Sequence, residues 1–102
     1  MRLLVQNGLP SVSVVEPHDF HRLHVEVTGL DATAASAALA DAGLGRMDAS
    51  GRAWLATRSL RALAEPFGAP PEWAEQWDAM LTYAAAKGWV RGGSIRAHVV
   101  GV

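Results

Sequence analysis

The segment FHRLHVEVT, residues 20–28, decides the fold class of this chain. Its apolar and polar side chains alternate with a period of two, which is the pattern of a β-strand with one buried face. The face predicted to be buried carries Leu23, Val25 and Val27. The opposite face carries Phe20, Arg22, His24 and Glu26. The segment therefore predicts a sheet that is covered on one side and open on the other.

Shorter strands are predicted on both sides of this segment. Residues 2–6 and 11–16 precede it and show similar alternation. Residues 44–56 predict a hairpin, because a turn sequence separates two short apolar runs. Residues 94–100 predict a last strand, whose polar face carries Arg96, His98 and Val100.

Three helices are predicted between and after these strands. The first covers residues 32–42, where Asp31 is a favourable N-cap. The second is short, with Thr57 as its predicted cap and Pro66 directly after its end. The third begins at Pro71 and runs to about Lys87.

This mixture of strands and helices predicts a single α+β domain over residues 1–102. We expect a two-layer sandwich, in which three helices pack on one face of a mostly antiparallel sheet of about five to six strands. An alternative stays open for the alanine-rich helix at 32–42, which could join two neighbouring parallel strands by a right-handed crossover.

Composition excludes several classes of function. The chain has 102 residues, a formal charge of −1 and no cysteine, so thiol catalysis and cysteine-based metal sites are excluded. Nucleic-acid binding is not expected, because no basic run is present. No apolar run reaches the length of a membrane span, and no secretory leader is evident. We therefore expect a soluble, cytoplasmic protein without a membrane partner.

The open sheet face carries the most chemically suggestive residues. If the strands at 20–28 and 94–100 are neighbours, five polar side chains form one patch: Arg22, His24, Glu26, Arg96 and His98. The two arginines are candidate ligand-binding residues, because a guanidinium can hold a carboxylate or phosphate with two hydrogen bonds. His24, His98 and Glu26 are candidate catalytic residues, with Glu26 setting the tautomer of a histidine that transfers protons.

Two other interpretations of this face are weighed beside the first. Mixed charges on an exposed sheet face are more commonly a solvated surface than a functional site. The same face could instead be where a second copy of the chain docks, because Phe20 and Val100 would add apolar contacts there.

The third predicted helix carries an aromatic stripe: Trp73, Trp77, Met80 and Tyr83. Such a stripe usually belongs to the core. The alternative is an apolar ligand pocket under the helix, for which Trp77 and Tyr83 are the candidate ligand-binding residues. Asp78 flanks the stripe, and its pKa would be raised if the fold buries it.

A metal site is not predicted, although His18, His21 and His24 are regularly spaced. In a strand, His21 and His24 point to opposite faces, so the three imidazoles do not converge. Phosphate-binding loops, dinucleotide-binding motifs and hydrolase motifs are also missing, and no cofactor is expected.

These observations favour a small binding or accessory domain that self-associates, as a homodimer, through or near its open sheet face. A small-molecule ligand is compatible with this hypothesis. The alternative is a compact enzyme without a cofactor, of isomerase, cyclase or dehydratase type. Its substrate would be small and anionic or apolar, and the histidine, arginine and glutamate side chains of the sheet face would act on it.

Overall fold

The computed structural model describes the chain over residues 1–102 as seven strands and three helices. The strands are β1 (Arg2–Gln6), β2 (Val12–Val15), β3 (His24–Thr28), β4 (Gly45–Met47), β5 (Ala53–Ala56), β6 (Val90–Arg91) and β7 (Ser94–Val100). The helices are α1 (Ala32–Asp41), α2 (Thr57–Ala64) and α3 (Pro71–Ala86). The α+β class and the three helices are confirmed.

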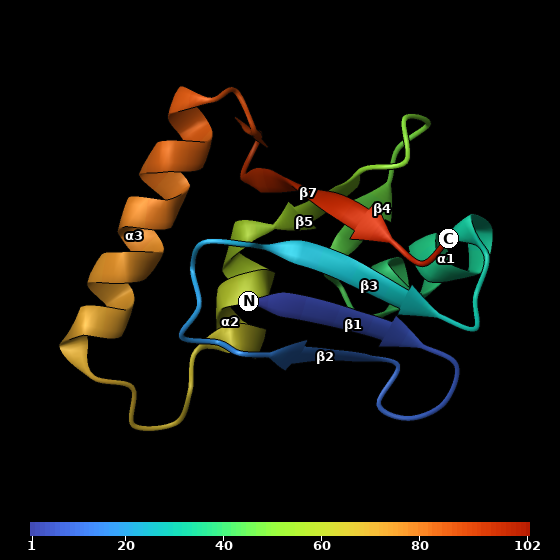
Figure 1. Ribbon diagram of the computed structural model, residues 1–102, viewed down its shortest axis with the longest axis horizontal. Coiled ribbons are helices and arrows are strands. Elements are labelled where there is room, and N and C mark those ends of the chain that lie inside the picture. The colour runs from blue at the N-terminus through green and yellow to red at the C-terminus, as the bar shows by residue number, and fades with distance from the viewer.

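The strands form one curled sheet in the order β2-β1-β3-β7-β5-β4, and β6 pairs with β7. The three middle strands β1, β3 and β7 run parallel, as Figure 1 shows, while the remaining pairings are antiparallel. The sheet is therefore mixed, where the sequence predicted a mostly antiparallel one. The reason lies in the position of β2, which pairs antiparallel with one edge of β1. After β2 the chain crosses to the other edge of β1, where β3 begins and runs parallel to β1.

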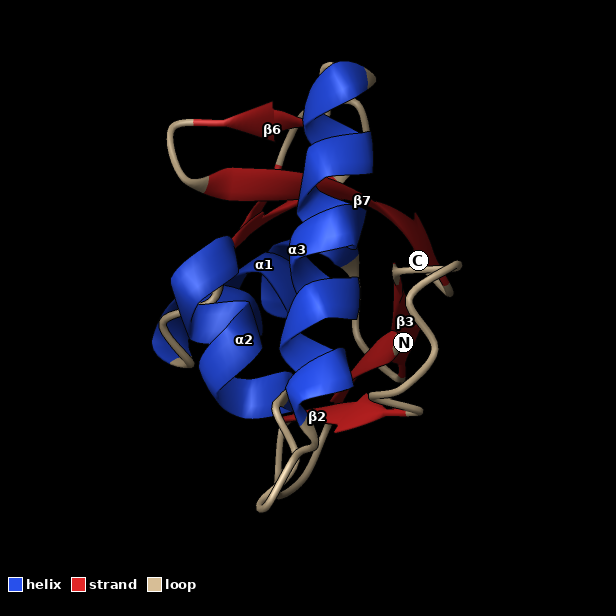
Figure 2. Ribbon diagram, turned by 90° about the vertical axis from the view of Figure 1, so that its left-hand side faces the viewer, coloured by secondary structure: helices blue, strands red, loops and turns tan.

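The helices do not form the single layer that was predicted. Helices α1 and α2 lie behind the sheet in Figure 1, whereas α3 stands beside it, near the ends where β1 and β3 begin. Figure 2 shows α3 crossing in front of the rest of the molecule from this side. Helix α1 joins β3 to β4, which are separated in the sheet by β7 and β5, so the crossover between neighbouring parallel strands is not formed.

The core is entirely apolar. All 19 buried residues are hydrophobic, and none is polar or charged. Leu3, Val25 and Val99 lie level with one another across β1, β3 and β7, which places the predicted alternation in one continuous layer. Because no charged side chain is buried, the side chains available for binding or catalysis lie at the surface or in its hollows.

Three local predictions are corrected. The strand predicted from Phe20 begins at His24, because the Phe20 ring packs edge-on against Trp73 at 5.5 Å between centroids and leaves the line of the sheet. Ala56, and not Thr57, is the N-cap of α2, and the Thr57 hydroxyl donates to the carbonyl of Gly93 at 3.1 Å. The short strand β6 was not predicted.

Candidate functional site

The strands that carry the predicted patch are neighbours. His24 of β3 lies level with His98 of β7, and Glu26 lies level with Val100. The flanking residues Val25 and Val99 are buried, so the two histidines point to the outer face. The contiguity that the sequence left open is therefore present at the His24–His98 pair.

Glu26 is the centre of a small ionic network on this face. Its Oε1 atom lies 2.9 Å from Nε2 of His24 and 3.4 Å from a guanidinium nitrogen of Arg2. Arg2 also contacts Glu16 at 3.2 Å. The hydrogen bond from His24 is the main cause that lowers the pKa of Glu26, with Arg2 adding to it and partial desolvation opposing it.

His24 is held on both of its ring nitrogens. Nδ1 lies 2.8 Å from the carbonyl oxygen of Arg22, and Nε2 lies 2.9 Å from the carboxylate of Glu26. Both partners are acceptors, so a charged imidazolium, which donates from both nitrogens, satisfies this arrangement fully. The ring therefore has no free nitrogen to offer a substrate, because Nε2 is already hydrogen-bonded to Glu26 and Nδ1 to the Arg22 carbonyl.

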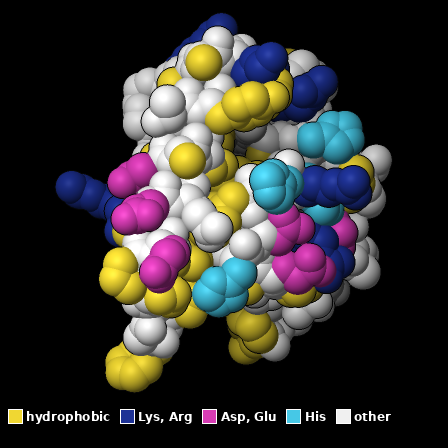
Figure 3. All heavy atoms as spheres, turned by 60° about the vertical axis from the view of Figure 1, so that its left-hand side comes forward, with side chains coloured by type: hydrophobic (Ala, Val, Ile, Leu, Met, Phe, Trp, Pro, Cys, Tyr) yellow, Lys and Arg dark blue, Asp and Glu magenta, His cyan; other side chains and the backbone are white.

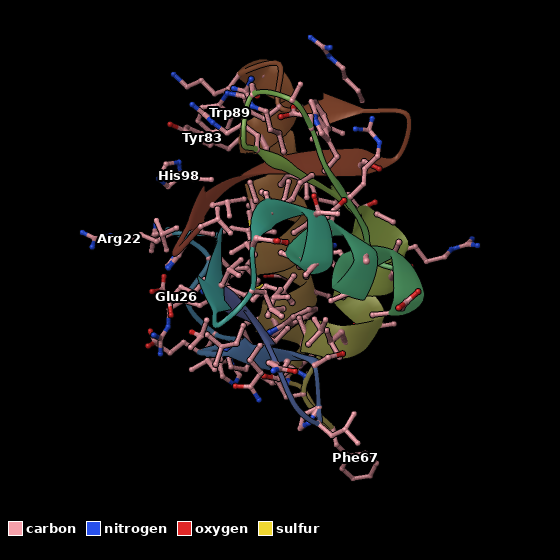
Figure 4. All side chains as sticks on the ribbon, turned by 90° about the vertical axis from the view of Figure 1, so that its right-hand side faces the viewer. Arg22, Glu26, Phe67, Tyr83, Trp89 and His98 are labelled. Carbon is pink, nitrogen blue, oxygen red and sulfur yellow. The ribbon has the colours of Figure 1, made fainter.

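Four other predicted residues line one pocket between α3, β7 and the loop before β3. Arg22, Arg96, His98 and Tyr83 contribute to a hollow of about 230 Å³. In Figure 4 the side chains of Tyr83, Trp89 and His98 lie along one side of the molecule, with Arg22 extending outward below them. The same pocket takes in a residue that sequence reasoning missed, Arg52, from the loop before β5.

Strand register explains the presence of Arg52. Ala53 lies level with Ala97, so Arg52 comes level with His98 one position further on. Trp54 lies level with Arg96 in the same pairing. In the sequence, the one signal for Arg52 is that it lies two residues before Trp54 and so shares a strand face with it. This signal identifies a neighbour of His98 only if β5 pairs with β7 as well as with β4.

The pocket has a one-sided charge. Arg52 and Arg96 are half-buried, and neither guanidinium takes part in an ion pair or donates a hydrogen bond to the protein. No aspartate or glutamate lines the pocket. Both guanidiniums are free to donate charge-assisted hydrogen bonds, and no carboxylate competes for them in the pocket, so it is suited to an anion.

Apolar side chains form the rest of the wall: Phe20, Leu23, Met80, Ala84, Trp89 and Ile95. Tyr83 and Trp89 meet edge to face at 6.1 Å between ring centroids, and the Lys87 ammonium lies 5.5 Å from the centre of the Tyr83 ring. A second hollow of about 540 Å³ adjoins the first and shares Phe20, His21, Met80 and Tyr83 with it. We call the two hollows together the α3 groove, with the arginine pocket as its inner part.

The space-filling view shows the surroundings of the groove. In Figure 3, histidine, Lys or Arg and Asp or Glu side chains gather on one side of a hollow, and hydrophobic and further Asp or Glu side chains lie on the other. The outer part of the groove is lined by polar side chains at its rim: His18, His21, Gln76 and Tyr83. Phe67, which is fully exposed, extends from the far end of the molecule and has no part in it (Figure 4).

Two candidates of the third helix lie outside the groove. Trp77 is 2% exposed and stacks on Trp73 at 5.5 Å between ring centroids, so it is a core residue with no surface for a ligand. Asp78 is exposed rather than buried. Among the aromatic stripe, Tyr83 alone is strongly exposed, at 60%, and it faces the groove.

The hairpin that carries Arg52 is organised by Asp48. One carboxylate oxygen accepts hydrogen bonds from the Ser50 amide, the Ser50 hydroxyl and the Arg52 amide, at 2.9, 2.6 and 3.0 Å. The other accepts from the indole of Trp54 at 2.8 Å. The hydrogen bond from the Ser50 hydroxyl, followed by that from Trp54, holds the pKa of Asp48 well below its ordinary value.

We expect Asp48→Asn to lower the melting temperature by an amount that depends on pH. A carboxyl group whose pKa is lowered by folding contributes stability above its unfolded pKa of about 3.8 and loses it as pH falls through the folded pKa. The difference in melting temperature from the unmodified protein is therefore complete at pH 7 and narrows below about pH 4. Thermal unfolding followed by circular dichroism from pH 7 to pH 3 measures it. Asp41→Asn is the control, because that exposed carboxylate accepts no hydrogen bond, and an equal effect there contradicts the prediction.

The structure gathers no group of three His, Asp or Glu side chains that could share a metal ion. His18 and His21 lie at the outer part of the groove, while His24 lies on the sheet. None of the helices is both long enough and apolar enough to cross a bilayer.

Comparison with known proteins identifies no relative: no protein-family model, curated protein or solved structure matches this chain. The candidate site is therefore described by its own geometry.

Proposed function

We propose that this chain is a binding domain that takes a small organic anion in the α3 groove. The observation that carries the proposal is the pair of half-buried arginines, Arg52 and Arg96, in a pocket without a carboxylate. An anion placed between them would accept charge-assisted hydrogen bonds that the protein itself does not supply. His98 stands at the same pocket and can donate a further hydrogen bond.

The charge of the chain as a whole does not explain these two arginines. The formal net charge is −1, so the positive character of the pocket is local. Elsewhere, Arg2 contacts Glu26 and Glu16, and Arg61 contacts Glu65 at 2.8 Å, whereas Arg46, Arg58 and Arg91 are unpaired but exposed. The arginines of the pocket have no such carboxylate partner, although they lie where the surface is hollow, which is the arrangement expected of a ligand site.

We expect Arg96→Ala to weaken the binding of phosphate by about tenfold to a hundredfold, because a hydrogen bond to a charged group contributes roughly 1.5–3 kcal/mol. Inorganic phosphate is the probe, and a titration of the ¹⁵N-labelled protein followed by NMR gives both the affinity and the residues that respond. In the unmodified protein, amide shifts should map to residues around Arg52 and Arg96.

Arg58→Ala is the matched control, because Arg58 is exposed on α2 and does not line the groove. It should leave phosphate affinity unchanged. Equal losses in the two variants, or phosphate shifts that map elsewhere, would overturn the proposed site.

The alternative function is an enzyme without a cofactor. The observation in its favour is that His98 lies in the same pocket as Arg96 and accepts no hydrogen bond from the protein, so its ring is available for proton transfer. The binding function is preferred because no carboxylate in the pocket can orient that ring, and because His24, the other candidate base, is held by two acceptors.

Self-association through the sheet face stays a prediction from the sequence. Of the two apolar residues that supported it, Phe20 packs against Trp73 instead of lying on the open face. Val100 is 40% exposed there and is the remaining apolar contact. A dimer that covers the α3 groove would compete with ligand, so the two functions can be distinguished by the concentration dependence of binding.

A further inference from the structure

We infer that the ligand of the α3 groove is an aromatic phosphate or carboxylate, with its anionic group at Arg52 and Arg96 and its ring in the outer part along α3. The inference rests on the proposed anion-binding function. Beyond the anionic group, it specifies that the remaining part of the ligand is an aromatic ring.

Size is the first argument. The arginine pocket holds about 230 Å³, which is less than the roughly 300–1,000 Å³ typical of sites for small organic ligands. The neighbouring hollow holds about 540 Å³ and lies directly beside it, because Phe20, His21, Met80 and Tyr83 line both. A ligand whose anionic group fills the inner part therefore places its body in the outer part.

The chemistry of the walls is the second argument. Arginines are confined to the inner pocket, and the outer one has none among its lining residues. Phe20, Met80 and Tyr83 line both parts of the groove, and the Trp89 ring lines the inner part. Aromatic edges and faces and a methionine sulfur all make favourable contacts with a flat ring.

The exposure of Tyr83 is the third argument. Its side chain is 60% exposed although Trp89 and Lys87 hold the ring in place from two sides. An exposed aromatic ring that is fixed by its neighbours presents a ready surface on which a ligand ring can pack without loss of side-chain freedom. The groove therefore keeps its arginines in the inner part, while Phe20 and Tyr83 continue its aromatic wall into the outer part.

The test compares three probes in NMR titrations of the full chain: inorganic phosphate, phenyl phosphate and benzyl alcohol. We expect phenyl phosphate to bind at least tenfold more tightly than inorganic phosphate, and to shift the Met80 methyl and Trp89 indole resonances. Tyr83→Ala should reduce this advantage severalfold. Thr82→Ala, an exposed neighbour outside the lining of the groove, should alter neither affinity.

The outcomes separate the two proposals. If phenyl phosphate binds no better than inorganic phosphate, and both depend on Arg96, the aromatic class is wrong and the anion site stands. If benzyl alcohol binds as well as phenyl phosphate and Arg96→Ala changes neither, the groove is an apolar site and both proposals fail. If no probe shifts residues of the groove, both fail as well.

Discussion

Replacement of Trp77 by alanine should lower the free energy of unfolding by about 3–5 kcal/mol. The side chain is 2% exposed, and its indole stacks on Trp73 with an interplanar angle of 12°. Removal leaves a cavity between α3 and the sheet and takes away the stacking partner of a second buried ring. Because small domains have a total stability of roughly 5–15 kcal/mol, the loss is a large share of what holds the fold. Urea unfolding followed by tryptophan fluorescence and circular dichroism measures it.

Two further variants keep this prediction decisive. Trp77→Phe retains an aromatic ring and should cost clearly less, which gives a readout even if the alanine variant does not fold. Tyr83→Ala lies on the same helix, but its side chain is 60% exposed, so it should change stability little. A Trp77→Ala protein as stable as Tyr83→Ala would contradict the burial of Trp77, and would restore its role as a ligand-binding candidate.

Gly45→Ala is expected to have the second-largest effect on stability. Gly45 begins β4 with a φ of +153°, and a Cβ atom there would lie 1.9 Å from the carbonyl oxygen of Trp54 and 2.9 Å from its carbon. The backbone strain is worth roughly 1–3 kcal/mol, and overpacking against a neighbouring backbone adds a cost of the same order. The strand must move away from β5, so we expect a large fall in melting temperature by calorimetry.

Gly43→Ala separates the two causes. Gly43 also has a positive φ, +71°, but a Cβ atom at this position would have no other atom within 4 Å. It therefore carries the backbone strain alone, about 1–2 kcal/mol. If the two variants lose the same stability, close contact between β4 and β5 contributes nothing, and the prediction for Gly45 is wrong.

Periodicity predicted the elements of this fold better than their assembly. The alternation of Val25 and Val27 identified β3, and Asp31 caps α1 with a hydrogen bond of 2.8 Å from the Ala34 amide. Alternation tells which face of a strand is buried, but it does not tell which strand lies beside it. The parallel pairings of β1, β3 and β7 join segments far apart in the chain, and no local signal specifies them.

The candidate site was predictable to the extent that it depended on strand faces. Arg96 and His98 share a face of β7, and both line the inner pocket, as does Tyr83. Arg22 precedes β3 and extends outward, because the chain at Phe20 turns toward Trp73 before the strand begins. Arg52 could not be identified, since its position follows from the pairing of β5 with β7 and from the hydrogen bonds that Asp48 makes in the hairpin.

The position of β7 has a consequence for how the protein folds during synthesis. This strand, residues 94–100, joins the β2-β1-β3 part of the sheet to the β5-β4 part. Until those residues have left the ribosome, the edges of β3 and β5 are both unpaired and offer backbone hydrogen-bonding groups to other chains. Closure then requires pairings between residues more than 70 positions apart, such as His24 with His98, which are slow to form. The nascent chain is therefore most exposed to aggregation and proteolysis before β7 has been made, and the two parts of the sheet can join only after residues 94–100 have emerged.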